Sequence, residues 1–173
     1  MAIGFLLSQG ILKSTDHIQD IQVDTNTLTV SHHAQTSPPS HSTPSPPPIH
    51  PSEIFRLTAF FQEKALLFKK TAIAESVALC SPTTIEVFSE DISSINAFYK
   101  TVGTAYLNTL IPAAFILITS DKLTQGFIEL LNTLSIKTVI SRTAPTAQAI
   151  QLAQTSNIQV YGFARGKRVN KYC

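Results

Sequence analysis

The chain has 173 residues, of which 43% are hydrophobic and 14% are charged, and this composition is typical of a folded domain rather than a disordered chain. The formal net charge of +2 is small and scattered, which argues against a nucleic-acid-binding surface. No run approaches the roughly 20 apolar residues that span a bilayer, so we expect no membrane segment. Cys80 and Cys173 lack metal-ligand or redox spacing, and we therefore expect a cytoplasmic protein.

The first unit that we expect, residues 1–33, is a helix followed by a hairpin. Residues 2–12 place apolar side chains at helical spacing and lack the basic start and cleavage site of a signal peptide. Segments 18–23 and 27–33 alternate polar and apolar residues, which predicts two half-buried strands.

The second unit, residues 34–51, contains seven prolines among serine, threonine and histidine, and this composition predicts a linker that buries little apolar surface. Four histidines lie in or beside it, and their spacing matches no established metal site. They are His32, His33, His41 and His50. We therefore assign no metal ligand.

The third unit, residues 52–173, is expected to be an α/β domain. Its first part predicts a helix capped by Ser52, a hairpin of buried strands at 77–80 and 84–88, and a helix capped by Asp91. Cys80 ends an apolar strand, which favours a thiol buried in the core over a reactive one.

The last third of the chain contains three short runs rich in β-branched and aromatic residues, at 113–119, 137–141 and 158–162. Two stretches of helical period separate them, so the pattern predicts a parallel βαβαβ unit. Ligands of such sheets bind beyond the carboxyl ends of the strands.

Polar or basic residues follow all three of these runs, and two of the turns also open helices, whose free N–H groups favour anions. We predict a phosphate-binding edge; ordinary solvated loop ends are the alternative. The candidate binding residues are Ser120, Lys122, Ser141, Arg142, Thr143, Phe163, Ala164, Arg165, Gly166, Lys167, Arg168 and Asn170.

Residues 140–170, ISRTAPTAQAIQLAQTSNIQVYGFARGKRVN, resemble the end of the FdhD/NarQ family of formate dehydrogenase accessory sulfurtransferases. In that family an S-R-x-A-P-T turn, a helix and a G-F-x-R-G-x-R-x-N tail follow one another. Residues 2–23 are similar to the family's G-F-L-x-x-E-G-I-I segment with its following D-x-I. Family members carry further strands upstream, so we expect an uncovered face or a covering partner.

The resemblance implies a cytidine-deaminase-like fold with a mixed sheet between helix layers. The family's C-x-x-C pair is missing from 34–51, and the deaminase zinc motifs are missing as well. Its T-G-G-x-H segment corresponds to 71–75, with Glu75 at the histidine position, and its R-E-D-V-G-R-H-N-A segment keeps Glu90, Asp91 and Asn96. The scaffold thus matches better than the polar groups.

The resemblance also implies a function: a cytoplasmic accessory protein that carries sulfur from a cysteine desulfurase to the molybdenum bis-molybdopterin guanine dinucleotide cofactor, before formate dehydrogenase receives it. The basic strand ends would then hold the dinucleotide phosphates, with GDP as a partial mimic, and Asn170 would orient a base or ribose edge. Without the cysteine pair we expect cofactor binding without persulfide chemistry, and we assign no catalytic residue. The alternative is a catalytically silent binding or dimerisation module, or a degenerate relic, of the same scaffold; a homodimer is one option.

Overall fold

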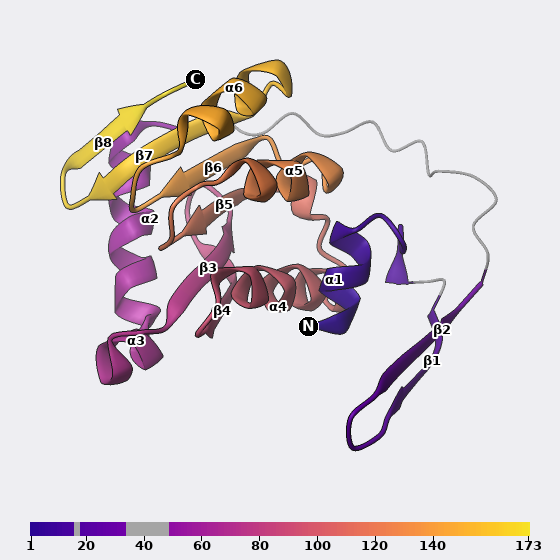
Figure 1. Cartoon of the computed structure of the whole chain (residues 1–173). Helices are drawn as coiled ribbons and strands as arrows, with labels where there is room; N and C mark the ends of the chain where they lie inside the picture. The colour runs from indigo at the N-terminus through magenta and orange to yellow at the C-terminus, as the bar shows by residue number, and fades with distance from the viewer. Residues whose placement is uncertain (16–17, 34–48) are drawn as a thin grey trace.

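The computed structural model describes residues 1–15, 18–33 and 49–173 (Figure 1). Its elements are α1 (Ala2–Ser8), β1 (Ile18–Val23), β2 (Leu28–His32), α2 (Pro51–Lys64), α3 (Leu66–Thr71), β3 (Glu75–Cys80), β4 (Ile85–Asp91), α4 (Ser94–Leu107), the 3-10 turn η2 (Pro112–Ala114), β5 (Ile116–Thr119), α5 (Gln125–Thr133), β6 (Thr138–Ser141), α6 (Ala147–Thr155), β7 (Gln159–Arg165) and β8 (Arg168–Lys171). The predicted linker falls largely on 34–48, outside the described residues.

Six strands form one mixed sheet in the order β4-β3-β5-β6-β7-β8. Strands β5, β6 and β7 are parallel neighbours, while β3, β4 and β8 run antiparallel to the strands beside them. Helix α5 connects β5 to β6 and α6 connects β6 to β7, so the carboxyl ends of these three strands meet at one edge of the sheet.

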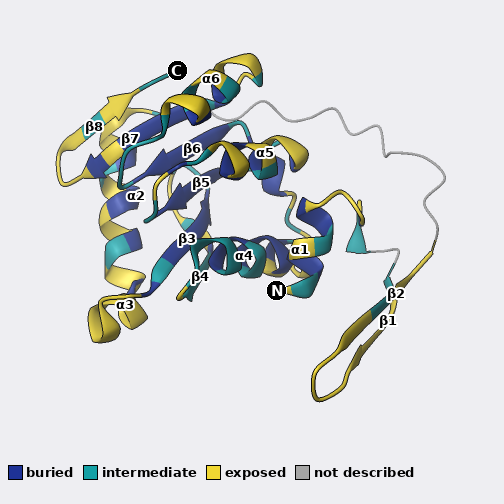
Figure 2. Cartoon of the chain, viewed as in Figure 1, coloured by how far each residue is buried: buried dark blue, intermediate teal, exposed yellow. Residues whose placement is uncertain are grey.

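Helices cover both faces of this sheet (Figure 2). On one face α1, α4, α5 and α6 pack against alternate residues such as Leu117 and Val139, and on the other face α2 packs against Ile118 and Ile140. All four of these strand residues are fully buried, as expected when successive side chains point to opposite faces of a two-sided sheet. The mixed sheet between helix layers is therefore confirmed; the cytidine-deaminase-like likeness stays a prediction.

Two predicted helix caps are wrong. Helix α2 begins at Pro51, its N-cap is His50, and the backbone N–H of His50 donates to Oε2 of Glu53 at 2.7 Å. Proline at the first helical position and glutamate at the third suit this earlier start, so Ser52 lies inside the helix. The N-cap of α4 is Ser93, and the Asp91 carboxylate, which accepts from the Ser93 N–H at 3.2 Å, lies two residues before that N-cap.

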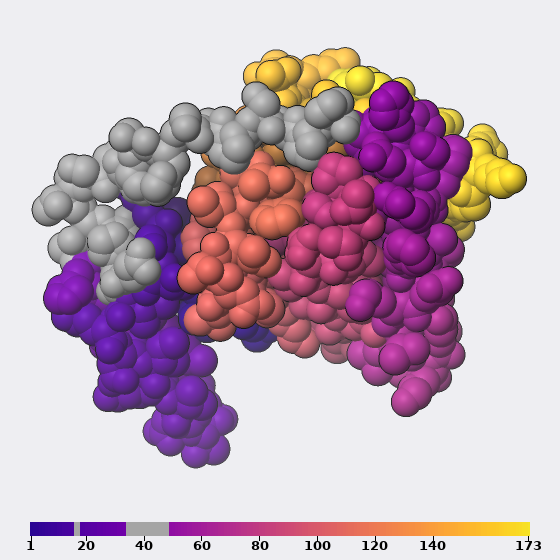
Figure 3. All heavy atoms as spheres, turned by 180° about the vertical axis from the view of Figure 1, so that it is seen from behind, coloured from indigo at the N-terminus to yellow at the C-terminus, as the bar shows by residue number. Residues whose placement is uncertain are grey.

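The hairpin β1–β2 is present as predicted, but its strands are not half-buried. It forms a separate two-stranded sheet that extends away from the rest of the molecule (Figure 1). Only Ile18 and Val30 are partly buried in it, whereas Val23 is 76% exposed. Seen from behind, the hairpin again lies well apart from α2 and α3, which form a ridge on the other side (Figure 3).

Cys80 lies inside the core, as predicted, and burial raises the pKa of its thiol far above the ordinary value. No helix in the part of the chain that the structure describes is long and apolar enough to cross a bilayer. The described residues likewise contain no group of three or more metal-ligating side chains; His41 lies outside them.

Candidate functional site

The turns that follow β5, β6 and β7 lie side by side and are joined through the backbone. The N–H of Arg142 donates to the carbonyl of Thr119 at 3.1 Å, and the N–H of Phe163 donates to the carbonyl of Thr143 at 3.0 Å. The three segments singled out in the sequence therefore form one continuous edge, which we call the strand-end edge: residues 120–122, 141–143 and 163–170.

The turn after β5 is tied to the neighbouring strand β3. The Ser120 hydroxyl donates to the Glu75 carboxylate and accepts from the Ser76 N–H at 2.8 Å. Because these two bonds engage the hydroxyl, Ser120 holds the edge together rather than offering a free donor to a ligand. Lys122 is exposed, and its N–H bonds to Oδ1 of Asp121 at 2.6 Å, which shapes the turn.

The turn after β6 is held by the hydroxyl of Ser141, which is fully buried. It donates to the carbonyl of Asp121 at 2.7 Å and accepts from the Thr143 N–H at 2.9 Å. The predicted site residues Ser141 and Thr143 thus both take part in hydrogen bonds of the turn. These bonds hold the backbone on either side of Arg142, where the chain leaves β6.

Arg142 is the most unusual residue of the edge. It is half-buried, and its Nε is shielded from solvent without a hydrogen-bond partner among the described residues. Burial lowers the pKa of Arg142, the neighbouring cation of Arg165 lowers it further, and the Glu75 carboxylate opposes both effects. A partly desolvated cation with an unused donor, next to a second cation, is suited to bind an anion.

The tail of the chain places its cations along the hairpin β7–β8. The Arg165 Nε donates to the carbonyl of Arg142 at 2.8 Å, which fixes this guanidinium beside the β6 turn. Arg165 pairs with Arg168 across the hairpin, and Lys167, Arg168 and Asn170 are exposed. The basic side chains of the tail can therefore all be reached from solvent.

Two glycines and an alanine of the tail differ in how close the surrounding atoms lie. Ala164 is fully buried in the core between the sheet and α2, so it cannot touch a ligand. Gly166 has φ of +58°, which suits glycine, and no described atom lies within 4 Å of its Cβ position, so a close backbone approach by a ligand stays a prediction. The crowded glycine is Gly162, where a Cβ would meet the carbonyl oxygen of Thr143 at 3.1 Å.

The same end of the sheet carries carboxylates over β3 and β4, which sequence reasoning did not assign to the site. Glu75 lies opposite Asp91 in the β3–β4 ladder, and Asp91 forms an ion pair with Lys100 at 2.5 Å. Asp121 accepts from the Ser94 hydroxyl at 2.7 Å. In the sequence, this carboxylate could be noticed only because Glu75 stands where the family motif has a histidine. Its place beside β5 could be known only from the strand order.

The helix N-termini at this edge are partly occupied by their own caps. The Thr124 hydroxyl accepts from the Phe127 N–H at 3.3 Å at the start of α5, and the Thr146 hydroxyl accepts from the Ala149 N–H at 3.2 Å at the start of α6. These bonds use N–H groups that an anion would otherwise meet, so the guanidinium groups are the stronger candidates for anion binding.

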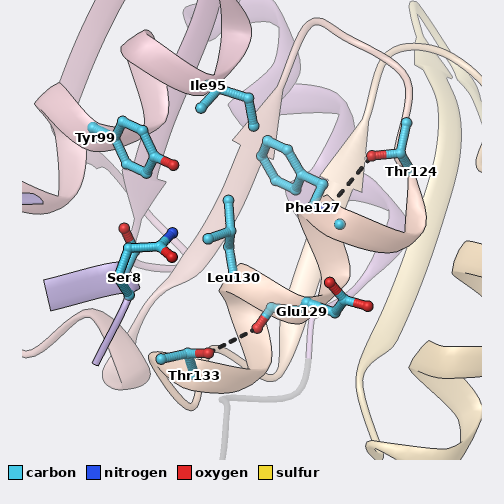
Figure 4. Close-up of a pocket in the computed structure, with 10 residues that line it drawn as sticks. Ser8, Ile95, Tyr99, Thr124, Phe127, Glu129, Leu130 and Thr133 are labelled. Carbon is cyan, nitrogen blue, oxygen red and sulfur yellow. Dashed lines mark hydrogen bonds between the residues drawn. The ribbon is translucent and has the colours of Figure 1, made fainter. Parts of the chain in front are cut away.

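An open groove of about 510 Å³ begins beside the edge and runs between α1, α4 and α5 (Figure 4). Ile95 and Tyr99 face Phe127 and Leu130 across it, while Thr124 lies at the end nearest the strand ends. The groove carries one carboxylate, Glu129, and no cation among its lining residues. It therefore does not suit an anionic ligand, unlike the strand-end edge.

Known proteins are similar to this chain in fold and in sequence. A model of the FdhD/NarQ family matches residues 29–173. The sulfur carrier protein FdhD of Listeria monocytogenes serotype 4b is 33% identical over 119 residues, which cover 69% of this chain and 46% of that protein. The sulfur carrier protein FdhD of Wolinella succinogenes is 23% identical across 99% of this chain and 70% of its own length.

A crystal structure of a formate dehydrogenase accessory protein from Desulfotalea psychrophila has the same fold. Its TM-score to this chain is 0.81 at 23% identity, and the match covers 98% of this chain and 73% of that protein. The chain spans about half the length of the first curated relatives it matches, at 46% and 47%. With the family model matching from β2 to the last residue, the chain belongs to the FdhD/NarQ family.

Proposed function

We propose that this chain is a formate dehydrogenase accessory protein that binds the guanine dinucleotide part of the molybdenum bis-molybdopterin guanine dinucleotide cofactor at its strand-end edge. The observation that carries the proposal is Arg142, whose half-buried guanidinium lies next to Arg165 and whose Nε has no hydrogen-bond partner among the residues that the structure describes. These two residues, with Arg168 and Lys167 on the tail, fit the negative charge of phosphate oxygens.

Each residue has a distinct part in this proposal. Arg142 and Arg165 hold phosphate oxygens, since Arg165 is already fixed by its bond to the Arg142 carbonyl. Lys122 and Lys167, both exposed, add long-range attraction rather than fixed contacts. When bound, the cofactor supplies the molybdenum centre that formate dehydrogenase uses, and Asn170 offers an amide to a base or ribose edge.

Sulfur transfer by this chain is not part of the proposal, because neither thiol is suited to it. Cys80 is fully buried, and burial also raises the pKa of the half-buried Cys173, whose Sγ lies 3.3 Å from the carbonyl of Ile158. A persulfide carrier needs an accessible thiolate. A cysteine desulfurase should therefore load no persulfide onto the purified chain, whereas label retained on a Cys80→Ala, Cys173→Ala double variant would contradict the need for a thiol.

Calorimetric titration with GDP tests the binding proposal. We expect a dissociation constant in the micromolar to millimolar range, and a loss of roughly tenfold or more for Arg142→Ala and Arg165→Ala, because a charge-assisted contact contributes about 1.5–3 kcal/mol. Arg168→Ala should also weaken binding. The matched control is Arg56→Ala: this exposed arginine bonds to the Pro82 carbonyl in the β3–β4 turn, at the other end of the sheet. No heat with GDP, or equal losses for all four variants, would remove the site.

The second candidate function is a binding or dimerisation module without a cofactor. It is favoured by α3, a helix that has no buried residue and presents Leu66 at 61% and Phe68 at 44% exposure. Large exposed apolar clusters often mark protein interfaces. Sedimentation analysis distinguishes the two functions: a dimer that Leu66→Ser and Phe68→Ser dissociate, together with no GDP binding, would favour the module.

A further inference from the structure

The β1–β2 hairpin has an apolar face that no other element of the described chain covers along its length. Two apolar pairs lie directly opposite each other in the register and so share this face: Ile21 with Val30, and Val23 with Leu28. Val30 packs against the core at the base of the ribbon, whereas the other three side chains are 42%, 76% and 45% exposed. The face therefore continues the core but lacks a second layer.

The opposite face and the tip of the hairpin are polar and acidic. The residues of this face form the pairs Asp20–Ser31 and Gln22–Thr29, and Asp24 follows β1 in the turn. Residues 18–32 contain no lysine or arginine, so the two aspartates give the hairpin a formal charge of −2. The hairpin is thus an amphipathic ribbon with negative charge beside its apolar face.

Helix α3 presents a second uncovered apolar surface, and its charge is of the opposite sign. None of its six residues is buried, and Leu66, Leu67 and Phe68 are 61%, 40% and 44% exposed. Its last turn carries Lys69 and Lys70, and the helix contains no acidic residue, so its formal charge is +2. An apolar surface with two cations is complementary to an apolar surface with two carboxylates.

The exposed side chains of α3 project from a backbone that is held in place. The Glu90 carboxylate accepts from the Leu67 N–H at 2.9 Å and from the Phe68 N–H at 3.0 Å. The Lys69 ammonium donates to the Glu63 carbonyl, in the last turn of α2, at 2.8 Å. A helix of six residues is too short to be stable alone, so these bonds stabilise it without covering its apolar side chains. The surface is therefore preorganised for a partner.

The hairpin and α3 lie at opposite ends of one edge of the molecule. Both extend beyond α4, the hairpin at the lower right and α3 at the lower left in Figure 1, and the view from behind shows both at the same edge (Figure 3). The hairpin therefore does not contact α3 of its own chain. A two-fold axis through this edge brings the hairpin of each copy to α3 of the other. One such contact is small, but a symmetric pair makes it twice, toward the roughly 1,200 Å² that specific interfaces bury.

We propose that two copies of this chain pair by exchanging their hairpins, each apolar hairpin face packing on α3 of the other copy with the aspartates beside Lys69 and Lys70. This inference goes beyond the proposed function and does not depend on it, since neither surface contains a residue of the strand-end edge. We expect a dissociation constant of about 10–100 μM, so the chain is monomeric, with its hairpin exposed, at about 1 μM.

Sedimentation equilibrium of the whole chain, from about 1 to about 500 μM, tests the exchange. Two charge-reversed chains are compared with wild type: Asp20→Lys with Asp24→Lys, and Lys69→Glu with Lys70→Glu. Each should pair roughly tenfold more weakly or worse when alone, because like charges then meet at both contacts. An equimolar mixture of the two chains should pair within about threefold of wild type, since opposite charges meet again at both contacts.

Recovery in the mixture, together with loss in each chain alone, is the result expected for exchange. If the chain with the reversed hairpin pairs as wild type does, the contact joins two α3 helices; if the chain with reversed α3 does, the contact joins two hairpins. Either result overturns the exchange. A wild-type chain that stays monomeric also overturns it, and sedimentation of that monomer with phosphatidylglycerol vesicles would assign α3 to an anionic membrane surface.

Two further comparisons separate pairing from misfolding. Lys171→Glu in β8 is the matched control for Lys70→Glu, because both lysines are exposed and only Lys70 belongs to the proposed interface. Lys70→Glu should weaken pairing about threefold or more, and Lys171→Glu less than about twofold. If a doubly reversed chain melts early, Val23→Ser and Leu66→Ser replace it, since both positions are exposed. Each should weaken pairing about fivefold or more, and no loss from either overturns the exchange.

Discussion

The six-stranded sheet and the β1–β2 hairpin differ sharply in burial, although both were predicted from apolar strand patterns. In the sheet, Leu117 and Ile118 face opposite helix layers and are both fully buried. In the hairpin, Ile21 and Val23 are 42% and 76% exposed. The difference teaches that an alternating pattern indicates a strand but not whether a second layer will cover it, and a lone two-stranded ribbon is marginally stable in water.

Among substitutions in the buried sheet domain, we expect the largest loss of stability from Phe98→Ala. Phe98 is fully buried in α4, and its ring lies 5.2 Å from that of Phe127 and 6.0 Å from that of Tyr99, centroid to centroid. Removing the ring leaves a cavity and should lower the free energy of unfolding by about 3–5 kcal/mol in urea titrations. The control is Phe60→Ala, since Phe60 is 43% exposed, and its cost should stay below about 1 kcal/mol. Similar losses for both would contradict the core assignment.

The contact between α1 and α4 should give the next largest effect. A Cβ added to Gly4 would lie within 1.8 Å of the Tyr99 carbonyl oxygen, and Gly103 approaches the same turn of α1. Gly4→Ala must therefore displace α1, and we expect a loss of about 1–3 kcal/mol from overpacking. Gly126→Ala is the matched control: nothing lies within 4 Å of its Cβ position in α5, so the change should stabilise the chain by about 0.5–1 kcal/mol.

Much of the fold could be predicted from the sequence because its helices and strands have strong local signals. The runs ending at Thr119, Ser141 and Arg165 lie where three short apolar segments predicted parallel strands. Each cap was missed by two residues, because Ser52 and Asp91 compete with His50 and Ser93 for the same role. Propensity alone does not rank such neighbours.

The candidate site was predicted less completely, since it depends on contacts between distant segments. The sequence predicts that the cations Arg142 and Arg165 lie at the strand ends. Only the structure shows that the Nε of Arg142 has no hydrogen-bond partner among the described residues. Glu75 meets Ser120 across 45 positions of sequence. The role of Ser120 as an internal hydrogen-bond partner therefore could not be found by inspecting its own turn.

Two Val→Thr substitutions, which nearly keep the side-chain shape, compare burial in the sheet with burial in the hairpin. Their expected effects on stability are smaller than that of Phe98→Ala. Val139→Thr puts a hydroxyl into a fully buried position of β6, and Val23→Thr puts one at the exposed end of β1. Burying the hydroxyl without a partner should cost about 1–3 kcal/mol, whereas the hairpin change should stay within about 0.5 kcal/mol. Equal costs in urea unfolding would mean that the hairpin is covered in solution.

The smallest effect concerns pH, at the acidic end of the same sheet. The Lys100 ammonium lowers the pKa of Asp91 through a hydrogen-bonded ion pair, with further bonds from the Ser93 N–H and the Asn96 amide. A carboxylate whose pKa is lower in the folded state stabilises the fold above its unfolded pKa of about 3.9, and this contribution is lost as pH falls through the folded value.

Because Lys100 is 41% exposed, the contribution should stay below about 1 kcal/mol. Urea unfolding from pH 7 to pH 2 should show that the wild-type chain loses more stability than Asp91→Asn below pH 4, so that the two curves converge. Asp24→Asn in the β1–β2 turn is the control, since among the described residues the Asp24 carboxylate accepts side-chain or backbone bonds from its neighbour Thr25 alone. Parallel curves for wild type and Asp91→Asn would show that the ion pair of Asp91 with Lys100 adds nothing to stability.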